Sequence, residues 1–454
     1  MMAAMALQKM AAAVGGELRG ADVEVQQVCT DSRKLKSGDL FIALNGENYD
    51  GNQFVADAVK AGAAAAIVSK ATDLLPSILV SDCRRALGLL ARENRRGFQG
   101  KVVAITGSSG KTSTKEMLAA IFAQCGEMYA TQGNLNNEIG VPLSLLALRA
   151  EHRFAVIEMG AAKQGDIAYL CEFAEPNIAV LTNAQPAHIE GFGSLEGVAK
   201  TKGEIFRCLP QGGLAVINAD DAFCSLWQGY AEHVQQRFFS LVREDVDVFA
   251  RDIDLSEPGK LRFELVSFKG SARVCMHLSG RHMVANALAA AAAALSAGVS
   301  LSDVVDGLES VRGASGRLLR REIAGVALID DTYNANPGSV RAAIDVLSNS
   351  LGRHILVLGN MAELGREAAL QHREVAACAR HNRLNSGFFI GEHAPMMAAE
   401  FGENGFAFKD KSALSAALNK YLQAGDTVLV KGSRSAAMET IVDDISAHLS
   451  QREH

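Results

Sequence analysis

The chain has 454 residues, of which 48% are hydrophobic and 21% charged, a composition typical of a globular protein of two or three domains. Its formal net charge of −6 comes without a basic stripe, which argues against general nucleic-acid binding. The longest alanine-rich run, residues 287–295, is far too short to span a bilayer, and no basic segment precedes the apolar N-terminus, so we expect a cytoplasmic protein without membrane insertion.

Eight cysteines are scattered along the chain, and none falls in a CxxC pair or at zinc-site spacing. We therefore expect reduced, mostly buried thiols and no disulfide framework. The sequence also has no low-complexity tract and no fixed-period repeat, so it should consist of ordinary folded domains.

The first 83 residues show helix and turn signals without regular alternation of strands and helices. An apolar segment at the start predicts a helix, and Asp50-Gly51 marks a turn. A polar stretch with the sequence DSR occupies residues 31–33. We predict a small separate α/β domain over residues 1–83.

From about residue 100, short apolar runs alternate with helical stretches. The strand candidates are residues 102–105, 155–157, 178–181 and 214–217, and a helix at 285–297 closes the region. This alternation predicts a mostly parallel sheet covered by helices, in a central domain at residues 84–313.

A second alternating set begins near residue 326. Its strand candidates are residues 326–329, 355–358, 388–390 and 428–430, and glycines follow three of them. The pattern predicts a Rossmann-like domain over residues 314–454. The segment 311–316 is rich in small residues and is the expected linker, with Gly313 and Gly316 as hinge candidates.

Residues 101–114, with the sequence KVVAITGSSGKTST, contain the strongest signal in the chain. Residues 102–105 predict a buried strand, and the apolar spacing after Thr112 predicts an amphipathic helix. The loop between them is shorter than a standard P-loop, in which a glycine would stand at the position of Ile105. A chance Gly-Ser turn before a helix is the alternative interpretation.

A strand, a glycine loop, Lys-Thr and a helix together form a phosphate cradle, because backbone N–H groups and the helix N-terminus face the anion. Lys111 would supply positive charge, and the Thr112 hydroxyl can ligate Mg²⁺. We expect the phosphates to contact Gly107, Ser108, Ser109, Gly110, Lys111, Thr112 and Ser113.

Polar residues follow two other central strands, where ligands bind in open α/β sheets. Glu158 follows residues 155–157, and a carboxylate there can hold Mg²⁺ on nucleotide phosphates. His188 follows the next strand and can ligate a metal or orient one of its ligands. The alternatives are an exposed glutamate at a strand end and a structural histidine. Lys200 and Lys202 by themselves indicate no more than two solvated helix lysines.

The last domain has polar loops after its first and last strands. Asp330 and Asp331 end the first strand, and a carboxylate there is well placed for a sugar hydroxyl. Lys431 and Arg434 follow the last strand, where two cations suit a carboxylate or a phosphate of a substrate. A plain surface turn is the alternative for the second loop.

Taken together, these motifs resemble the Mur ligases, the ATP-dependent amino-acid-adding enzymes of peptidoglycan precursor synthesis. The sequence TGSSGKT at 106–112 is similar to that family's shortened phosphate loop. Glu158, His188, Lys202, residues 280–286, Arg317 and Asp331 follow in the family's order along essentially the whole chain. The resemblance implies an α/β protein with an N-terminal UDP-substrate-binding domain, a central P-loop-type parallel-sheet ATPase domain and a C-terminal Rossmann-like ligase domain.

Within the family, the chain is most similar to the ligase that joins D-alanyl-D-alanine to UDP-MurNAc-tripeptide. The stretches that favour it are residues 133–140, 331–339, 358–365 and 431–434, and the Asp-Asn-Pro-Arg signature of the diaminopimelate-adding ligase is absent. The alternatives are another Mur ligase, a folylpolyglutamate synthase-type ligase, a P-loop switch or a nucleotide-binding protein without catalysis. The guanine-reading Asn-Lys-x-Asp motif of GTPases is absent.

The resemblance implies a role for each candidate residue. Lys111, His188 and Lys202 would be catalytic, and Lys202 would be carbamylated. ATP would be contacted at adenine by Asn286, at the ribose by Asp331 and at the phosphates by Arg317. Two Mg²⁺ ions would be held by Thr112, Glu158, His188 and Lys202. The substrates would contact Asn134, Asn137, Asn334, Asn336, Lys431 and Arg434, with Ser32 and Arg33 at the uridine nucleotide.

The resemblance also implies a reaction through an acyl phosphate, catalysed by a monomer. Two positions depart from the family's pattern. Met283 stands where the adenine motif usually has its first asparagine, and Asn52 stands where a histidine is common. A methionine cannot make the amide contact to adenine that an asparagine would make.

Overall fold

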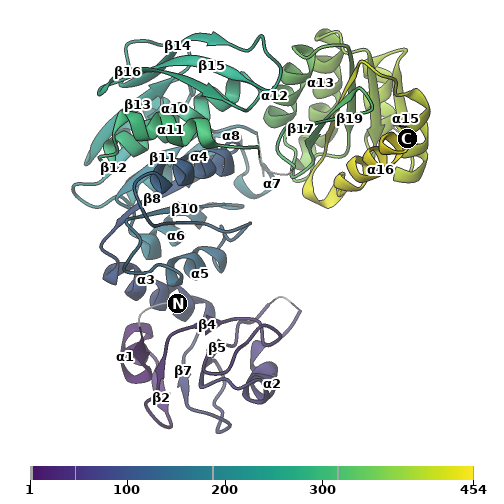
Figure 1. Cartoon of the computed structure of the whole chain (residues 1–454). Coiled ribbons are helices and arrows are strands. Elements are labelled where there is room, and N and C mark those ends of the chain that lie inside the picture. Colours follow the sequence, from purple (N-terminus) through teal and green to yellow (C-terminus); the bar gives the residue numbers. More distant parts are fainter. Residues whose placement is uncertain (1–3, 47, 187–188, 314–315, 453–454) are drawn as a thin grey trace.

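Figure 1 shows a computed structural model of the chain, which describes residues 4–46, 48–186, 189–313 and 316–452. Three main sheets follow one another along the described sequence, and helices pack against each of them. The N-terminal sheet lies at one end, and the C-terminal sheet, green to yellow, lies beside the central one (Figure 1). Within these ranges, no helix combines the length and the apolar character that crossing a membrane would require.

The N-terminal sheet has the order β2-β7-β6-β5-β4, with β2 antiparallel to β7 and the remaining pairs parallel. Its strands are β2 (Glu17–Arg19), β4 (Val28–Cys29), β5 (Leu40–Ile42), β6 (Ala65–Val68) and β7 (Ser77–Leu79), and β1 (Met5–Ala6) pairs separately with β3 (Glu24–Val25). Its helical elements are α1 (Leu7–Val14), η1 (Gly51–Phe54), α2 (Val55–Lys60) and α3 (Cys83–Gly97).

Helix α3 joins the first two sheets. It packs on α1 and, on its other side, on α5 (Gly140–Leu146) and α6 (Asp166–Ala174). One apolar core therefore runs from the N-terminal sheet into the central part of the chain. The predicted boundary between residues 83 and 84 falls at the start of α3, and it stays a prediction.

The central sheet has the order β16-β15-β14-β13-β12-β11-β8-β10-β9, parallel except for the antiparallel pairs β14–β15 and β15–β16. Its strands are β8 (Lys101–Thr106), β9 (Met128–Ala130), β10 (Phe154–Glu158), β11 (Ile178–Leu181), β12 (Leu214–Asn218), β13 (Gln235–Ser240), β14 (Val248–Asp254), β15 (Leu261–Ser267) and β16 (Gly270–Met276). The parallel strands before residue 218 match the prediction, whereas the β13–β16 extension and the short β9 were not predicted.

The two faces of the central sheet are covered by different helices. Val103 and Ile105 of β8 face the side of α4 (Lys111–Ala123), α10 (Arg281–Ser296) and α11 (Leu301–Ser310), while Val102 and Ala104 face the other side. The second side carries α6, α7 (Ile189–Phe192), α8 (Leu195–Arg207) and α9 (Cys224–Tyr230) as well as α3 and α5. This alternation between two buried faces within the apolar run 102–105 is typical of a sheet covered on both sides.

The C-terminal sheet has the order β17-β18-β22-β19-β20-β21, and only the edge strand β17 is antiparallel. Its strands are β17 (Leu319–Ile323), β18 (Val326–Asp331), β19 (Arg353–Leu358), β20 (Ser386–Ile390), β21 (Gly405–Phe408) and β22 (Asp426–Lys431). The helices on one face are α12 (Pro337–Ser348), α13 (Ala368–His381) and α14 (Ala394–Phe401). The short 3-10 helix η2 (Gly365–Glu367) directly precedes α13. The other face carries α15 (Lys411–Tyr421), η3 (Arg434–Ala436) and α16 (Glu439–Ser450).

The predicted α/β fold class is confirmed, and the four strands predicted in the last part are observed, whereas β17 and β21 were not predicted. The predicted linker at 311–316 includes residues 314 and 315, which lie outside the described residues. Gly316 has a φ of +72°, a left-handed conformation that glycine adopts without steric cost. The domain limits 84–313 and 314–454 remain predictions.

Candidate active site

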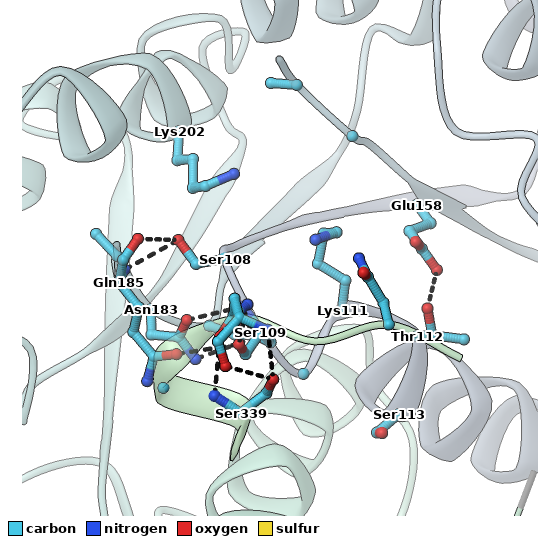
Figure 2. Close-up of a pocket in the computed structure, with 18 of the residues that line it drawn as sticks. Ser108, Ser109, Lys111, Thr112, Ser113, Glu158, Asn183, Gln185, Lys202 and Ser339 are labelled. Atoms are coloured by element: carbon cyan, nitrogen blue, oxygen red, sulfur yellow. Dashed lines mark hydrogen bonds between the residues drawn. The ribbon is translucent and has the colours of Figure 1, made fainter. Parts of the chain in front are cut away.

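A cavity of about 1410 Å³ lies between the central and C-terminal sheets. It is lined by loops that follow β8, β10 and β11, by the start of α10, and by loops that follow β18 and β22. The carboxyl ends of parallel strands from two sheets therefore meet at one hollow, which is where open α/β sheets bind ligands. Figure 2 shows its side chains converging from both sheets.

The predicted phosphate loop forms one wall of the cavity and is held by the end of β11. The Ser108 N–H donates to the Asn183 carbonyl and the Ser109 N–H to the Asn183 side chain, each at 3.0 Å (Figure 2). Thr182 Oγ1 donates to the Ser109 carbonyl at 2.6 Å. The loop is thus fixed from outside, and helix α4 starts at Lys111 directly after it.

Glycine is required at both ends of this loop. Gly107 and Gly110 have φ values of +152° and +83°, and a Cβ on either would collide with a side chain, Thr182 in the first case and Asn286 in the second. The loop can therefore turn tightly beside Asn286 only because these positions lack side chains. Free N–H groups at the start of α4 and the helix dipole make the position favourable for an anion.

Two lysine amines point into the cavity. Lys111 Nζ donates to the Gly107 carbonyl at 2.7 Å, and burial lowers its pKa, with Glu158 opposing the shift and Arg317 adding to it. Lys202 on α8 is 1% exposed, and its Nζ lies 5.6 Å from the centre of the Phe192 ring. Burial, with repulsion from Lys111, lowers the Lys202 pKa well below its usual value. The structure thus favours a neutral amine at position 202.

Glu158, at the end of β10, is a buried carboxylate with a partner on each oxygen. Thr112 Oγ1 donates to Oε2 at 2.9 Å (Figure 2), and Asn136 Nδ2 donates to Oε1 at 2.8 Å. The side chain is 2% exposed. The alternative of a solvent-exposed glutamate is therefore wrong.

The oxygens of Glu158 and Thr112 fit Mg²⁺, which prefers hard oxygen ligands and takes one or two protein carboxylates together with phosphate oxygens. Among the described residues, no group of three or more His, Cys, Asp or Glu side chains could hold a metal on its own. This small ligand set suits an ion that arrives with a nucleotide and not an all-protein metal cage. His188, the other predicted ligand, lies outside the described residues.

The start of α10 and the end of β18 hold the residues predicted for adenine and ribose. Asn286 on α10 is buried, and its Nδ2 donates to Met283 Sδ at 3.7 Å. Asp331 forms an ion pair with Lys431 at 2.5 Å, and burial raises the Asp331 pKa while Lys431 opposes that shift. Lys431 Nζ also donates to the Asn334 carbonyl at 2.9 Å. Lys431 is therefore engaged within its own domain, which was not predicted.

Two hydrogen bonds link the C-terminal sheet to the phosphate loop. Arg317 Nη2 donates to Thr112 Oγ1 at 3.0 Å, and Asn336 Nδ2 donates to Ser109 Oγ at 3.2 Å. Asn336 is also the N-cap of α12, where it forms a capping box with Ser339. The hydroxyls of Thr112 and Ser109, predicted to contact phosphates, are therefore hydrogen-bonded to candidate site residues more than 200 positions away in the sequence.

The cavity brings together most of the predicted residues. Its wall contains Ser108, Ser109, Gly110, Lys111, Thr112, Ser113, Asn134, Asn137, Glu158, Lys202, Asn286, Arg317, Asp331, Asn334, Asn336 and Lys431. Arg434 is not part of it, because this side chain pairs with Glu439 on the surface at 3.0 Å. Ser32 and Arg33 lie in the N-terminal domain, where Arg33 pairs with Asp31 at 2.8 Å.

The interpretation of two solvated helix lysines is right for Lys200, which forms a solvent-exposed pair with Glu196 at 2.7 Å, and wrong for the buried Lys202. Two other polar side chains have structural positions that the sequence did not indicate. Asp330 accepts bonds from Gly316 and Thr332 and is structural. Asn52 holds the loop after β6 by accepting the N–H groups of the two residues that follow the strand. A fixed structural role thus explains the asparagine at position 52.

Residues 183–185 and Asn136 were missed in the sequence analysis. Asn183 and Gln185 support the phosphate loop, since Ser109 Oγ donates to Gln185 Oε1 at 3.0 Å (Figure 2). Their position directly after a predicted central strand was the available signal. Asn136 sits between the two predicted asparagines, and nothing in the sequence ranks the three.

Comparison with known proteins identifies the class of enzyme. The chain matches the Mur ligase middle domain at residues 105–294, the Mur ligase glutamate ligase domain at 316–434 and the Mur ligase family catalytic domain at 24–97. It belongs to the Mur ligase family.

Two relatives that cover nearly the whole chain have the name UDP-N-acetylmuramoyl-tripeptide–D-alanyl-D-alanine ligase. The protein of that name from Escherichia coli K12 is 44% identical over 97% of this chain and 98% of its own length. The one from Haemophilus influenzae is 39% identical over 93% of both chains. The prediction of the family is thus confirmed, and the similarity extends over nearly the full length.

Solved structures of the same enzyme, MurF, have the same fold. A MurF structure from Acinetobacter baumannii superposes with a TM-score of 0.93 at 37% identity, covering 98% of this chain and 99% of that one. MurF from Thermotoga maritima, solved in complex with ADP, gives a TM-score of 0.85 at 30% identity and covers 94% and 99% of the two chains.

The histidine at the start of α10 should make stability depend on pH. Burial, with a smaller effect from Lys431, lowers the pKa of His282 to about 4 from its usual 6.5. Between these values the unfolded chain binds a proton that the folded chain does not, so stability falls as the pH drops from about 6.5 towards 4. We expect the unfolding free energy, measured with urea, to fall less between pH 7.5 and 5.0 in His282→Gln than in the wild-type protein. The exposed His381→Gln is the control, and an equal loss in both variants contradicts the assignment.

Proposed function

We propose that this protein is a MurF-type ligase, an ATP-dependent amide ligase that joins D-alanyl-D-alanine to UDP-MurNAc-tripeptide and releases ADP and phosphate. The observation that carries the proposal is its 44% identity, over nearly the whole length of both chains, to a ligase of that name. The phosphate loop with Lys111, Thr112 and Glu158 around one cavity provides the chemical support. The ADP complex of the Thermotoga enzyme supports ATP as the nucleotide.

The chemistry requires a carboxylate to be activated before an amine can attack it. The terminal carboxylate of the peptide attacks the γ-phosphorus of ATP, and the bond from the γ-phosphorus to its bridging oxygen breaks to give an acyl phosphate and ADP. The amine of D-alanyl-D-alanine then attacks the acyl carbon, loses a proton, and phosphate leaves as the tetrahedral intermediate collapses. Two anions must approach each other in the first step, so the site must neutralise charge and fix their positions.

The residues of the cavity suit these tasks. Lys111 would bind the phosphates, and the loop amides and the α4 N-terminus would orient them. Thr112 and Glu158 would hold a Mg²⁺ ion, which lowers the charge of the phosphates when bound. Arg317 would move from Thr112 to a phosphate oxygen, and Asn286 and Asp331 would contact adenine and ribose. His188 and Lys202 would hold a second Mg²⁺ ion.

A protonated Lys202 has no lone pair for a metal, and a carbamate on this residue would offer the oxygen ligands that Mg²⁺ prefers. Carbamylation would convert its amine and CO₂ into a carbamate with release of a proton. The reaction needs a neutral amine, and the burial that lowers the Lys202 pKa supports that form.

The remaining substrate contacts are proposed by position. Asn134, Asn137, Asn334 and Asn336 face the cavity and suit the peptide, and Ser32 and Arg33 suit the uridine nucleotide. Residues 1–83, 84–313 and 314–454 would act as the UDP-substrate, ATP and ligase domains. We also propose that the enzyme works in the cytoplasm as a monomer.

Removing the loop amine should abolish turnover without unfolding the protein. We expect Lys111→Ala to lower ATP-dependent phosphate release by two or more orders of magnitude, because charge neutralisation at transferring phosphates is worth several kcal/mol. The control, Lys200→Ala, removes a surface amine and should keep normal activity. Near-normal turnover of the Lys111 variant would overturn the assignment of the loop.

A carbamate on Lys202 should be visible by ¹³C NMR. We expect protein equilibrated with ¹³C-bicarbonate to show a carbamate carbonyl resonance that is lost in Lys202→Met and kept in Lys200→Met. The difference follows from burial, since only Lys202 is held away from solvent as a neutral amine. A spectrum that is the same in both variants rules the modification out.

The acceptor can be tested directly by phosphate release. With ATP, Mg²⁺ and UDP-MurNAc-tripeptide present, we expect release to require D-alanyl-D-alanine and not to be supported by free D-alanine or diaminopimelate. Release at the same rate without the dipeptide would contradict the proposed acceptor.

A further inference from the structure

Asn136 holds a position that its two flanking asparagines do not share. Asn134, Asn136 and Asn137 all face the cavity. Of the three, Asn136 is the one whose side chain donates to Glu158, at 2.8 Å to Oε1. Asn137 instead uses its side chain at the start of α5, where Oδ1 accepts the N–H groups of Ile139 and Gly140.

The backbone fixes Asn136 in place at the end of β10. The Gly160 N–H donates to the Asn136 carbonyl at 2.8 Å, and the Asn136 N–H donates to the Asn134 carbonyl at the same distance. A Cβ at position 160 would lie 3.1 Å from Asn136 Oδ1, so glycine at that position allows the close approach. Asn136 is therefore held twice, through its main chain by Gly160 in the loop after β10 and through its side chain by Glu158 at the end of β10.

The two hydrogen bonds to Glu158 come from different parts of the chain. Oε2 accepts from Thr112, which directly follows the phosphate loop, whereas Oε1 accepts from the side-chain amide of Asn136, which lies outside that loop. A carboxylate in a buried site can rotate about its last bond unless both oxygens are held. The Asn136 amide removes that freedom and leaves Oε2 on the side of Thr112.

We propose that Asn136 is a positioning residue for the metal site: its amide fixes the Glu158 carboxylate so that Oε2, together with Thr112 Oγ1, is presented to the Mg²⁺ ion that accompanies the nucleotide. The inference rests on the proposed function only in taking a Mg²⁺–nucleotide complex as the ligand. Residues that orient a metal ligand typically contribute 10- to 100-fold to metal affinity.

The test measures how strongly Mg²⁺ improves nucleotide binding. ADP affinity is measured by calorimetry with the whole protein, once in EDTA and once with MgCl₂, and the ratio of the two dissociation constants is the readout. We expect Asn136→Ala to reduce this ratio about tenfold while the affinity for metal-free ADP stays within twofold of the wild-type value. A residue with a merely structural role would change both affinities together.

Two further variants make the result specific. Asn349→Ala removes the same amide from the exposed C-terminal end of α12 and should leave the ratio unchanged. Gly160→Ala leaves Asn136 in the chain but places a Cβ against its amide, and should lower the ratio by a smaller factor in the same direction. Thermal unfolding of each variant checks that the fold is kept.

The outcomes separate this inference from the proposed function. An unchanged ratio in Asn136→Ala, or an equal loss of both affinities, overturns the positioning role. Because no peptide substrate takes part, the result does not depend on which acceptor the enzyme uses, and failure of the acceptor assay leaves it standing. In the ligase assay, Asn136→Ala should need about tenfold more Mg²⁺ for half-maximal rate with an unchanged KM for D-alanyl-D-alanine.

Discussion

The site depends first on the attachment of the phosphate loop to the end of β11. A short loop that contains two glycines is intrinsically flexible, and the helix N-terminus that follows it binds an anion well only when the loop is fixed beforehand. The Asn183 carbonyl and side chain accept the N–H groups of Ser108 and Ser109, and Thr182 donates back to the loop. Strands β8 and β11 are neighbours in the sheet, so the hydrogen bonds between them fix the distance between the phosphate loop, which follows β8, and Asn183, which follows β11.

A second constraint is the charge balance in the cavity. The buried amine of Lys202 and the half-buried amine of Lys111 face one buried carboxylate, Glu158, and an ion pair between Asp331 and Lys431 lies on the side of the C-terminal sheet. Burial lowers the pKa of both amines, so keeping either one charged has a free-energy cost. An anionic ligand beside Lys111 would offset that cost, whereas Lys202 in its neutral form suits the proposed carbamylation.

Much of this organisation was predictable because it rests on local signals. A continuous apolar run, then glycines and Lys-Thr, then apolar residues at helical spacing predict β8, the loop and α4. The ends of predicted strands indicate where Glu158 and Asp331 lie. The β13–β16 extension was not predicted because a strand with one partly exposed face, such as β15, carries polar residues at alternate positions and lacks the continuous apolar run of a strand buried on both faces.

Side-chain partners were less predictable than strand positions. Arg434 looked like a substrate cation, but a glutamate five residues later neutralises it at the surface. Lys431, three residues earlier, is buried and paired with Asp331, a partner that is remote in sequence. Which of three neighbouring asparagines reaches Glu158 depends on a turn geometry that the sequence does not encode in any simple pattern.

One packing contact has a consequence for ligand size. Gly110 ends the phosphate loop directly against the side chain of Asn286, with no room for even a methyl group between them. The phosphate loop and Asn286 therefore share one wall of the cavity. A side chain at position 110 would have to displace Asn286, so these two residues together set the space that a ligand can occupy there.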